Sequence, residues 1–119
     1  MMQAGIFTGY FPYGLEETAR KIRALDFNTV QLDLHFKDID LTAGQITPDK
    51  AKKVRDTFRR HNLPVCCVSG YTNIIHPDKA ERQQRVGYLK EIIRNARGFG
   101  SRYVISETHL QYGIGLGAS

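Results

Sequence analysis

The sequence predicts an α/β fold built from parallel β/α units. Short apolar segments typical of strands alternate with longer amphipathic segments typical of helices, in the order β-α-β-α-β-α-β. No hairpin turn signal separates the strand segments, and alternation of this kind favours parallel pairing through right-handed crossovers. Two arrangements fit the pattern: a small open doubly wound sheet, or the N-terminal half of a (β/α)8 barrel. A complete barrel needs about 250 residues, and the chain has 119.

The first predicted strand is "QAGIFTGYF" (3–11), which ends at a glycine and a proline. The segment "GLEETARKIRALDF" (14–27) predicts a helix, because apolar residues recur on one face and acidic residues occupy the first turn. The apolar face consists of Leu15, Ala19, Ile22 and Leu25.

The second predicted strand, "TVQLDLHF" (29–36), alternates between apolar and polar side chains. Its apolar face carries Val30, Leu32 and Leu34, and its polar face carries Gln31, Asp33 and His35. A helix is expected over 47–62, with Thr47 as N-cap and Pro48 in the first helical position. The buried stripe of this helix is Ala51, Val54 and Phe58.

The third predicted strand, "LPVCCVSG" (63–70), is apolar throughout, as parallel strands covered on both faces are. Neighbours on a strand point to opposite faces, so we expect Cys66 and Cys67 to be reduced packing residues. Asp78 and Glu81 predict a capping box for a long helix that closes near Gly98 and Gly100. Its core-facing residues are Val86, Leu89, Ile92, Ile93 and Ala96, and "SRYVISE" (101–107) is the fourth strand.

Composition and charge narrow the class of protein. The formal net charge is +5, which permits attraction to phosphates, but the basic residues are spread over three helical segments. We therefore expect ordinary solvated helix faces and no nucleic-acid partner. No apolar run approaches the roughly 20 residues that span a bilayer, and the N-terminus lacks the pattern of a signal peptide. The expected location is cytoplasmic, without a membrane partner.

The segment "VSGYTNIIHPDKAERQQRVGYLKEIIRNARGFGSRYVISET" resembles the sugar phosphate isomerase/epimerase family, the xylose isomerase-like TIM barrels. Family members show a strand ending in Ser-Gly, a loop with Asn and a Pro-Asp turn. A helix ending in a pattern such as "A-x-x-L/F-G" and a strand ending in a polar signature such as Glu-Thr-Gly follow. Gly5 and "VQLDL" also fit, so the resemblance spans residues 3–108 and covers four strands and three helices of the barrel.

The resemblance implies metal-assisted proton transfer on a sugar or sugar phosphate. In the family, a divalent metal (Mn²⁺, Mg²⁺ or Co²⁺) is held by two Glu, an Asp and a His from strands five to eight. A carboxylate base works beside a metal that polarises the neighbouring oxygens. None of those four ligands maps onto this sequence, so we expect this chain to bind no metal itself and to supply rim and pocket residues.

Five residues are candidates for substrate binding at the ends of the strands. Glu107 ends the fourth strand, where a charged side chain needs either solvent or a polar pocket. His35 lies on the polar face of the second strand, facing either a sugar or only a local hydrogen-bond partner. Ser69, Asn73 and His76 follow the third strand, and either bind substrate or, in the case of Asn73, stabilise the turn.

Other polar and aromatic residues carry weaker hypotheses. Tyr10, Phe11 and Tyr13 form either an apolar wall for a sugar face or packing beneath the first loop. His61 sits at a helix end, where a cation complements the helix dipole. The four histidines have no i, i+4 spacing that indicates a metal cluster.

Three functions compete. The first is a truncated isomerase/epimerase-like protein. The second is a DNA-repair nuclease like the AP endonucleases of the related zinc barrels, which carry a zinc-binding His where Ser69 stands and a His-Pro-Gly where this chain has "SETH". The third is a half-barrel fragment that is either inactive or self-associates as a homodimer, because a half-barrel exposes a sheet edge on each side.

The predicted domain boundary lies at residue 108, with 109–119 as a tail unlike the family. The family often continues as "ETGTYNTESDW" after the fourth strand. One permitted codon set for "HLQYGIGLGAS", read one base later, encodes "IYNTESDWVH", so we expect a frameshift to be the origin of this tail. We therefore do not expect His109 to act as a ligand.

Overall fold

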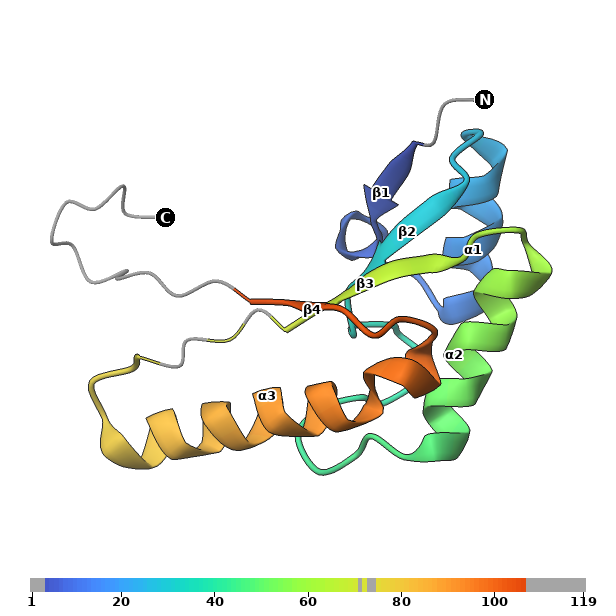
Figure 1. The fold of residues 1–119 in the computed structure, drawn as a ribbon. Coiled ribbons are helices and arrows are strands. Elements are labelled where there is room, and N and C mark those ends of the chain that lie inside the picture. Colours follow the sequence, from blue (N-terminus) through green and yellow to red (C-terminus); the bar gives the residue numbers. More distant parts are fainter. Residues whose placement is uncertain (1–3, 71, 73–74, 107–119) are drawn as a thin grey trace, which may run out of the picture.

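Strands and helices alternate along the chain in the predicted order (Figure 1). The computed structural model describes residues 4–70, 72 and 75–106. Its elements are β1 (Gly5–Phe7), the 3-10 turn η1 (Thr8–Tyr10), α1 (Leu15–Ala24), β2 (Thr29–Leu32), α2 (Pro48–Arg60), β3 (Val65–Ser69), α3 (Lys79–Phe99) and β4 (Val104–Ile105).

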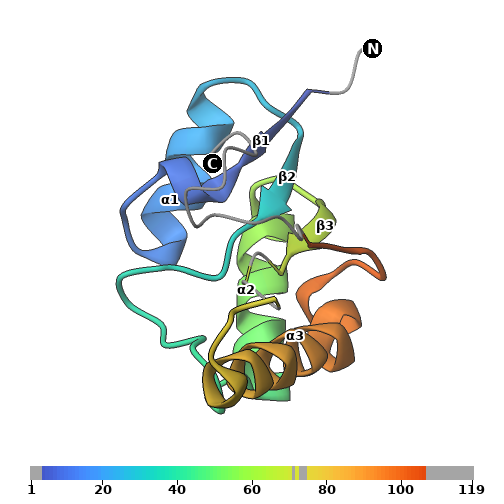
Figure 2. The ribbon, with the colours of Figure 1, turned by 90° about the vertical axis from the view of Figure 1, so that its left-hand side faces the viewer.

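The sheet decides between the two predicted arrangements. Its order is β1-β2-β3-β4, every neighbouring pair is parallel, and Val68 of β3 lies opposite both Leu32 of β2 and Val104 of β4. A doubly wound sheet reverses its strand order part-way and carries helices on both faces. Here the order never reverses, and α1 and α2 lie behind the same face of the sheet, with α3 beside α2 (Figures 1 and 2). The fold is therefore an α/β half of a TIM barrel.

The core lies between the sheet and the helices. Val30, Leu32 and Val68 of the strands are each 0% exposed. The predicted stripe of α2 is equally buried, and the Phe58 ring lies 6.1 Å from the ring of Phe36. Helices α1 and α3 each bury one apolar face against this core, with the residues Ala19, Ile22, Ile92, Ala96 and Phe99.

The helix ends follow from local chemistry. The Thr47 hydroxyl accepts a hydrogen bond from the Lys50 N–H at 3.2 Å, which confirms Thr47 as the N-cap of α2. Gly100, with φ of 110°, ends α3 in the left-handed conformation that glycine adopts readily. The predicted capping box of α3 is half correct. Asp78 Oδ2 accepts from the Glu81 N–H, but the Asp78 N–H donates to His76 Nδ1 at 3.1 Å.

Two apolar residues are more exposed than predicted. Ile93 is 55% exposed, because the buried stripe of α3 runs through Ile92, and Ile93 lies about 100° further around the helix. Leu25 is 60% exposed, because α1 ends at Ala24 and the chain turns away there. The predicted second strand also stops early, at Leu32, although Leu34 is buried as expected.

The prediction for the cysteines is correct for Cys67 and wrong in part for Cys66. Both are free thiols and Cys67 is buried as a packing residue, but Cys66 is exposed because it points to the other side of the strand. An extra residue in β3, opposite the step from Val30 to Gln31 in β2, makes the register irregular at this point. Burial raises the pKa of the Cys67 thiol to about 11, so it stays protonated near neutral pH and is a poor nucleophile.

Within the described part of the chain, none of the helices combines the length and apolar character that crossing a membrane requires.

Candidate functional site

Polar side chains gather where three neighbouring strands end. Thr8 follows β1, Asp33 follows β2, and Ser69 is the last residue of β3. Parallel strands bring their carboxyl ends to one edge of the sheet, and barrel enzymes build their active sites at this edge. The candidate site therefore lies at this edge.

Thr8 fixes the ends of β1 and β2 to each other. Its side chain is 1% exposed, and its hydroxyl oxygen accepts a hydrogen bond from the Asp33 N–H at 2.8 Å. A buried backbone N–H without a partner is costly, so this bond determines where the chain leaves β2. The position of the Asp33 carboxylate follows from it.

Asp33 and His35 form a carboxylate–imidazole pair at this edge. Asp33 Oδ2 lies 2.8 Å from His35 Nδ1, and the side chains of His35 and Asp33 are 77% and 16% exposed. The carboxylate orients the imidazole through Nδ1, as second partners of functional histidines commonly do. The exposed ring presents Nε2 to solvent, where it can donate or accept a hydrogen bond.

Gln31 and Ser69 form a second polar pair. Gln31 Nε2 donates to Ser69 Oγ at 3.0 Å, and Ser69 is 5% exposed. A hydroxyl that accepts one hydrogen bond still has its own proton to donate. Ser69 is therefore a hydrogen-bond donor held in a fixed position.

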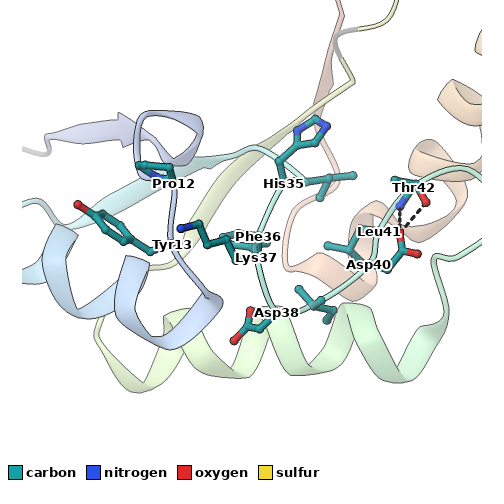
Figure 3. Close-up of a pocket in the computed structure, with 11 residues that line it drawn as sticks. Pro12, Tyr13, His35, Phe36, Lys37, Asp38, Asp40, Leu41 and Thr42 are labelled. Carbon is teal, nitrogen blue, oxygen red and sulfur yellow. Dashed lines mark hydrogen bonds between the residues drawn. The ribbon is translucent and has the colours of Figure 1, made fainter.

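His35 also lines a shallow pocket of about 690 Å³ (Figure 3), whereas Asp33, Gln31 and Ser69 are not among its lining residues. Pro12 and Tyr13 line it from one loop, and residues 34–42 line it from the segment after β2. The Lys37 N–H donates to the Tyr13 carbonyl at 3.1 Å, which joins the two loops. In Figure 3 the Lys37 ammonium extends toward Tyr13, whereas the His35 ring points away from it.

Residues at the rim of the pocket also stabilise the local backbone. Asp38 Oδ1 accepts from the Leu15 N–H at 2.9 Å and so caps α1 from another loop. The residue at the N-cap position itself is Gly14, and a Cβ there would come within 2.7 Å of Asp38 Oδ2. On the far side, hydrogen bonds from Thr42 hold the pKa of Asp40 below its ordinary value.

The structure brings two of the five candidates, His35 and Ser69, to this edge of the sheet. His76 lies in the loop before α3, where Nδ1 accepts from the Asp78 N–H and the carbonyl accepts from Arg82 at 3.0 Å. Asn73, Glu107 and the tail 109–119 lie outside the described residues. Substrate binding by all five remains a prediction.

The three aromatic candidates and His61 lie in different environments. Tyr10 is 73% exposed and makes an edge contact with Phe7, Phe11 packs against the core, and Tyr13 lines the pocket. His61 follows the last turn of α2, as expected, and Nε2 also pairs with Glu16 of α1.

Sequence reasoning did not single out Thr8 or Lys37. Thr8 lies inside the segment predicted as a single strand, 3–11, but β1 ends at Phe7 and Thr8 begins η1. The only sequence signal for this break is a polar residue before Gly9. Lys37 lies in a polar loop, and two long-range hydrogen bonds, from the Lys37 N–H to the Tyr13 carbonyl and from the Leu15 N–H to Asp38, place this loop against the segment before α1.

A family model described as the xylose isomerase-like TIM barrel matches residues 19–117. The chain belongs to the xylose isomerase-like TIM barrel family. The match extends beyond the boundary predicted at residue 108, and that boundary stays a prediction. A search of curated proteins gave no match.

The described residues do not fit the divalent metal that the resemblance implies. Across 4–70, 72 and 75–106, no three His, Cys, Asp or Glu side chains come together as a metal site. Asp33 and His35 make a pair, which is fewer than the three or four protein ligands that a catalytic metal normally has. The chemistry of these residues is hydrogen bonding and charge.

Proposed function

We propose that this chain forms the substrate-facing N-terminal half of a barrel that isomerises or epimerises a sugar or sugar phosphate. The observation that carries the proposal is the convergence of Thr8, Asp33 and Ser69 at the carboxyl ends of three parallel strands. His35, the partner of Asp33, lines a pocket at this edge. Membership of the barrel family supports the same edge as the catalytic one.

In this proposal the residues bind and orient the sugar. The ring of Tyr13 covers an apolar sugar face, as amphipathic aromatic side chains do. Ser69 donates to a hydroxyl, His35 exchanges a hydrogen bond through Nε2, and the Lys37 ammonium attracts a phosphate group. Among the described residues, no three His, Cys, Asp or Glu side chains come together to hold a metal, so their proposed role is binding and orientation of the sugar.

The test is binding of a sugar phosphate followed through backbone amide resonances. A pentose or hexose phosphate is expected to shift the amides near Tyr13, Lys37 and Ser69, and the unphosphorylated sugar to bind more weakly. Lys37→Gln should weaken binding of the sugar phosphate by about tenfold or more, since a charge-assisted hydrogen bond contributes roughly 1.5–3 kcal/mol.

Lys53→Gln is the matched control, because Lys53 is an exposed lysine on α2 and its loss changes the net charge equally. The proposal fails if neither sugar shifts these amides, or if both variants weaken binding to the same extent. Turnover of a sugar with added Mn²⁺ would extend the proposal from binding to catalysis.

A second candidate function is self-association as a homodimer. Neither outer edge, that of β1 or that of β4, has a partner strand in the described part of the sheet. At the β4 edge, Tyr103 and Ile105 are 59% and 41% exposed. Two copies related by a twofold axis could pair each β4 with the other β1 and close eight parallel strands.

Light scattering after size-exclusion chromatography tests the dimer. A doubled mass is expected, and Ile105→Lys should return the mass to that of a monomer. Leu25→Lys is the control, because Leu25 is 60% exposed on the helix side of the molecule. A monomer at every concentration, or equal effects of the two variants, contradicts this candidate.

A further inference from the structure

Three arginines surround a hollow at the opposite end of the sheet from the candidate site. Arg59, Arg97 and Arg102 line a hollow of about 310 Å³ together with Gly100 and Ser101. These residues lie where α2 and α3 end and where the chain enters β4. They are therefore at the amino ends of the strands.

Tight packing of α3 against α2 brings the arginines together. A Cβ at Gly98 would lie 3.1 Å from the Cβ of Ala51, and a Cβ at Gly100 would lie 3.2 Å from Arg55 Cγ. The two glycines thus allow the end of α3 to approach α2 closely. Gly100 adopts the left-handed conformation that ends α3, and Ser101 and Arg102, which follow it, line the same hollow as Arg59 and Arg97.

The three guanidinium groups have no acidic partner among the residues that the structure describes. Some arginines of the same helices do have acidic partners: on α2, Arg60 pairs with Glu16 at 3.1 Å, and on α3, Arg85 pairs with Glu81 at 3.4 Å. Arg102 instead lies over the ring of Tyr103, 5.5 Å from its centroid. An anion in the hollow would meet positive charge from three separate elements.

The helix dipole accounts for only part of this cluster. Arg59 and Arg97 lie in the last turns of α2 and α3, where a cation complements the partial negative charge of the helix end. Arg102 lies beyond the ends of both helices, so it has no capping role. The neighbouring Ser101 hydroxyl already makes two hydrogen bonds, because it donates to the Cys66 carbonyl and accepts from the Tyr103 N–H.

We propose that this hollow binds a small phosphate dianion, either free phosphate or the phosphate group of a monoester. Guanidinium forks match phosphate oxygens with paired hydrogen bonds. The two helix ends account for Arg59 and Arg97 but leave Arg102 unexplained. The site is separate from the sugar pocket proposed above, because it lies at the other end of the strands. It acts as a second, anion-specific site on this half of the barrel.

Titration with inorganic phosphate at constant ionic strength tests this site, with chloride as the comparison anion. The amides of Gly100, Ser101 and Arg102 should shift, while those of Tyr13 and Lys37 report separately on the sugar pocket. Arg97→Gln and Arg102→Gln should each weaken phosphate binding about tenfold. Arg20→Gln, which removes an exposed arginine of α1 that pairs with Glu17, should leave it unchanged.

A monoester such as glycerol phosphate is the second arm of the experiment. Tighter binding of the monoester than of phosphate assigns the site to phosphorylated metabolites, and equal binding assigns it to free phosphate. The proposal is overturned if chloride shifts the same amides equally or if Arg20→Gln weakens binding as much as Arg102→Gln. Binding of only a single-stranded oligonucleotide would also overturn it, in favour of a polyanion surface.

Discussion

The two faces of the sheet are built from different chemistry although they alternate along the same strands. On the helix-covered face, Val30, Leu32 and Val68 are completely buried against apolar helix residues. On the other face, Gln31 and Ser69 bond to each other, and Asp33 pairs with His35. One face holds the units together, and the other presents hydrogen-bonding groups.

This difference separates folding from binding. The apolar side chains of β2 and β3 pack against those of the helices and fill the space between sheet and helices. The polar face has no helix over it in the described structure, and its groups are arranged by hydrogen bonds instead of by packing (Figure 2). Substitutions on the first face should change stability, and substitutions on the second should change the geometry of the site.

The largest effect is expected for Phe58→Ala. Phe58 is 0% exposed and packs against Phe36 in the centre of the apolar face. Losing this ring leaves a cavity and should cost about 3–5 kcal/mol of the free energy of unfolding. Urea unfolding followed by circular dichroism measures the loss.

Two further variants calibrate that result. Phe58→Leu should cost less, roughly 1.5 kcal/mol, because much of the volume is kept, and it stays measurable if the alanine variant does not fold. Ile93→Ala should cost within about 0.5 kcal/mol, since Ile93 is 55% exposed. If Ile93→Ala costs as much as Phe58→Ala, the apolar face is not where the stability resides.

A smaller effect is expected for Thr8→Val on the polar face. Valine keeps the shape of threonine but leaves the Asp33 N–H without the partner it has at 2.8 Å. An unsatisfied buried donor costs about 1–3 kcal/mol. The resonances of Asp33 and His35 should shift as well, because their position depends on this bond.

Thr42→Val is the matched control for Thr8→Val. Its hydroxyl also makes a hydrogen bond, to Asp40 Oδ1 at 2.6 Å, but the pair is exposed. Water replaces such a bond, so a change within about 0.5 kcal/mol is expected. Equal losses in the two variants would mean that burial of Thr8 does not matter.

The sequence predicted the apolar face better than the polar one. Its periodicities placed Val30, Leu32 and Phe58 in the core, because burial is determined by spacing along a single element. Ile93 was misplaced, since five apolar residues on α3 define a wider stripe than the sheet covers. Strand order was left open in the sequence, because pairing of β1 with β2 and of β3 with β4 depends on distant segments.

The candidate site was predicted only in part for the same reason. His35 and Ser69 were recognisable as polar residues at strand ends, and both lie at the predicted edge. Their partners Asp33 and Gln31 were placed on the polar face, but the two hydrogen-bonded pairs were not predicted. The hydrogen bond from the Asp33 N–H to Thr8 joins residues 25 apart in the sequence, and no local sequence pattern predicts such a contact.

The smallest effect is expected where polar contacts join the outer surfaces of the helices. The hydrogen bond with His61 is the main cause that lowers the pKa of Glu16 below its ordinary value of 4.5, with Arg60 contributing as well. A carboxyl whose pKa is lower in the folded state stabilises the fold above the unfolded pKa and loses this contribution as the pH falls. The contact between α1 and α2 should therefore weaken as the pH falls below 4.5.

The loss should be smaller than that of Thr8→Val, because the side chain of Glu16 is 55% exposed and water screens its charge. Glu16→Gln should flatten the acid limb of a stability–pH curve measured by urea unfolding, and Glu17→Gln, which removes a neighbouring carboxyl that does not contact His61, should leave it nearly unchanged. High salt should reduce the difference between the two variants. If Glu16→Gln instead costs as much as Phe58→Ala, the helices are held by their surface charges, and the contrast between a packed face and a hydrogen-bonded face is wrong.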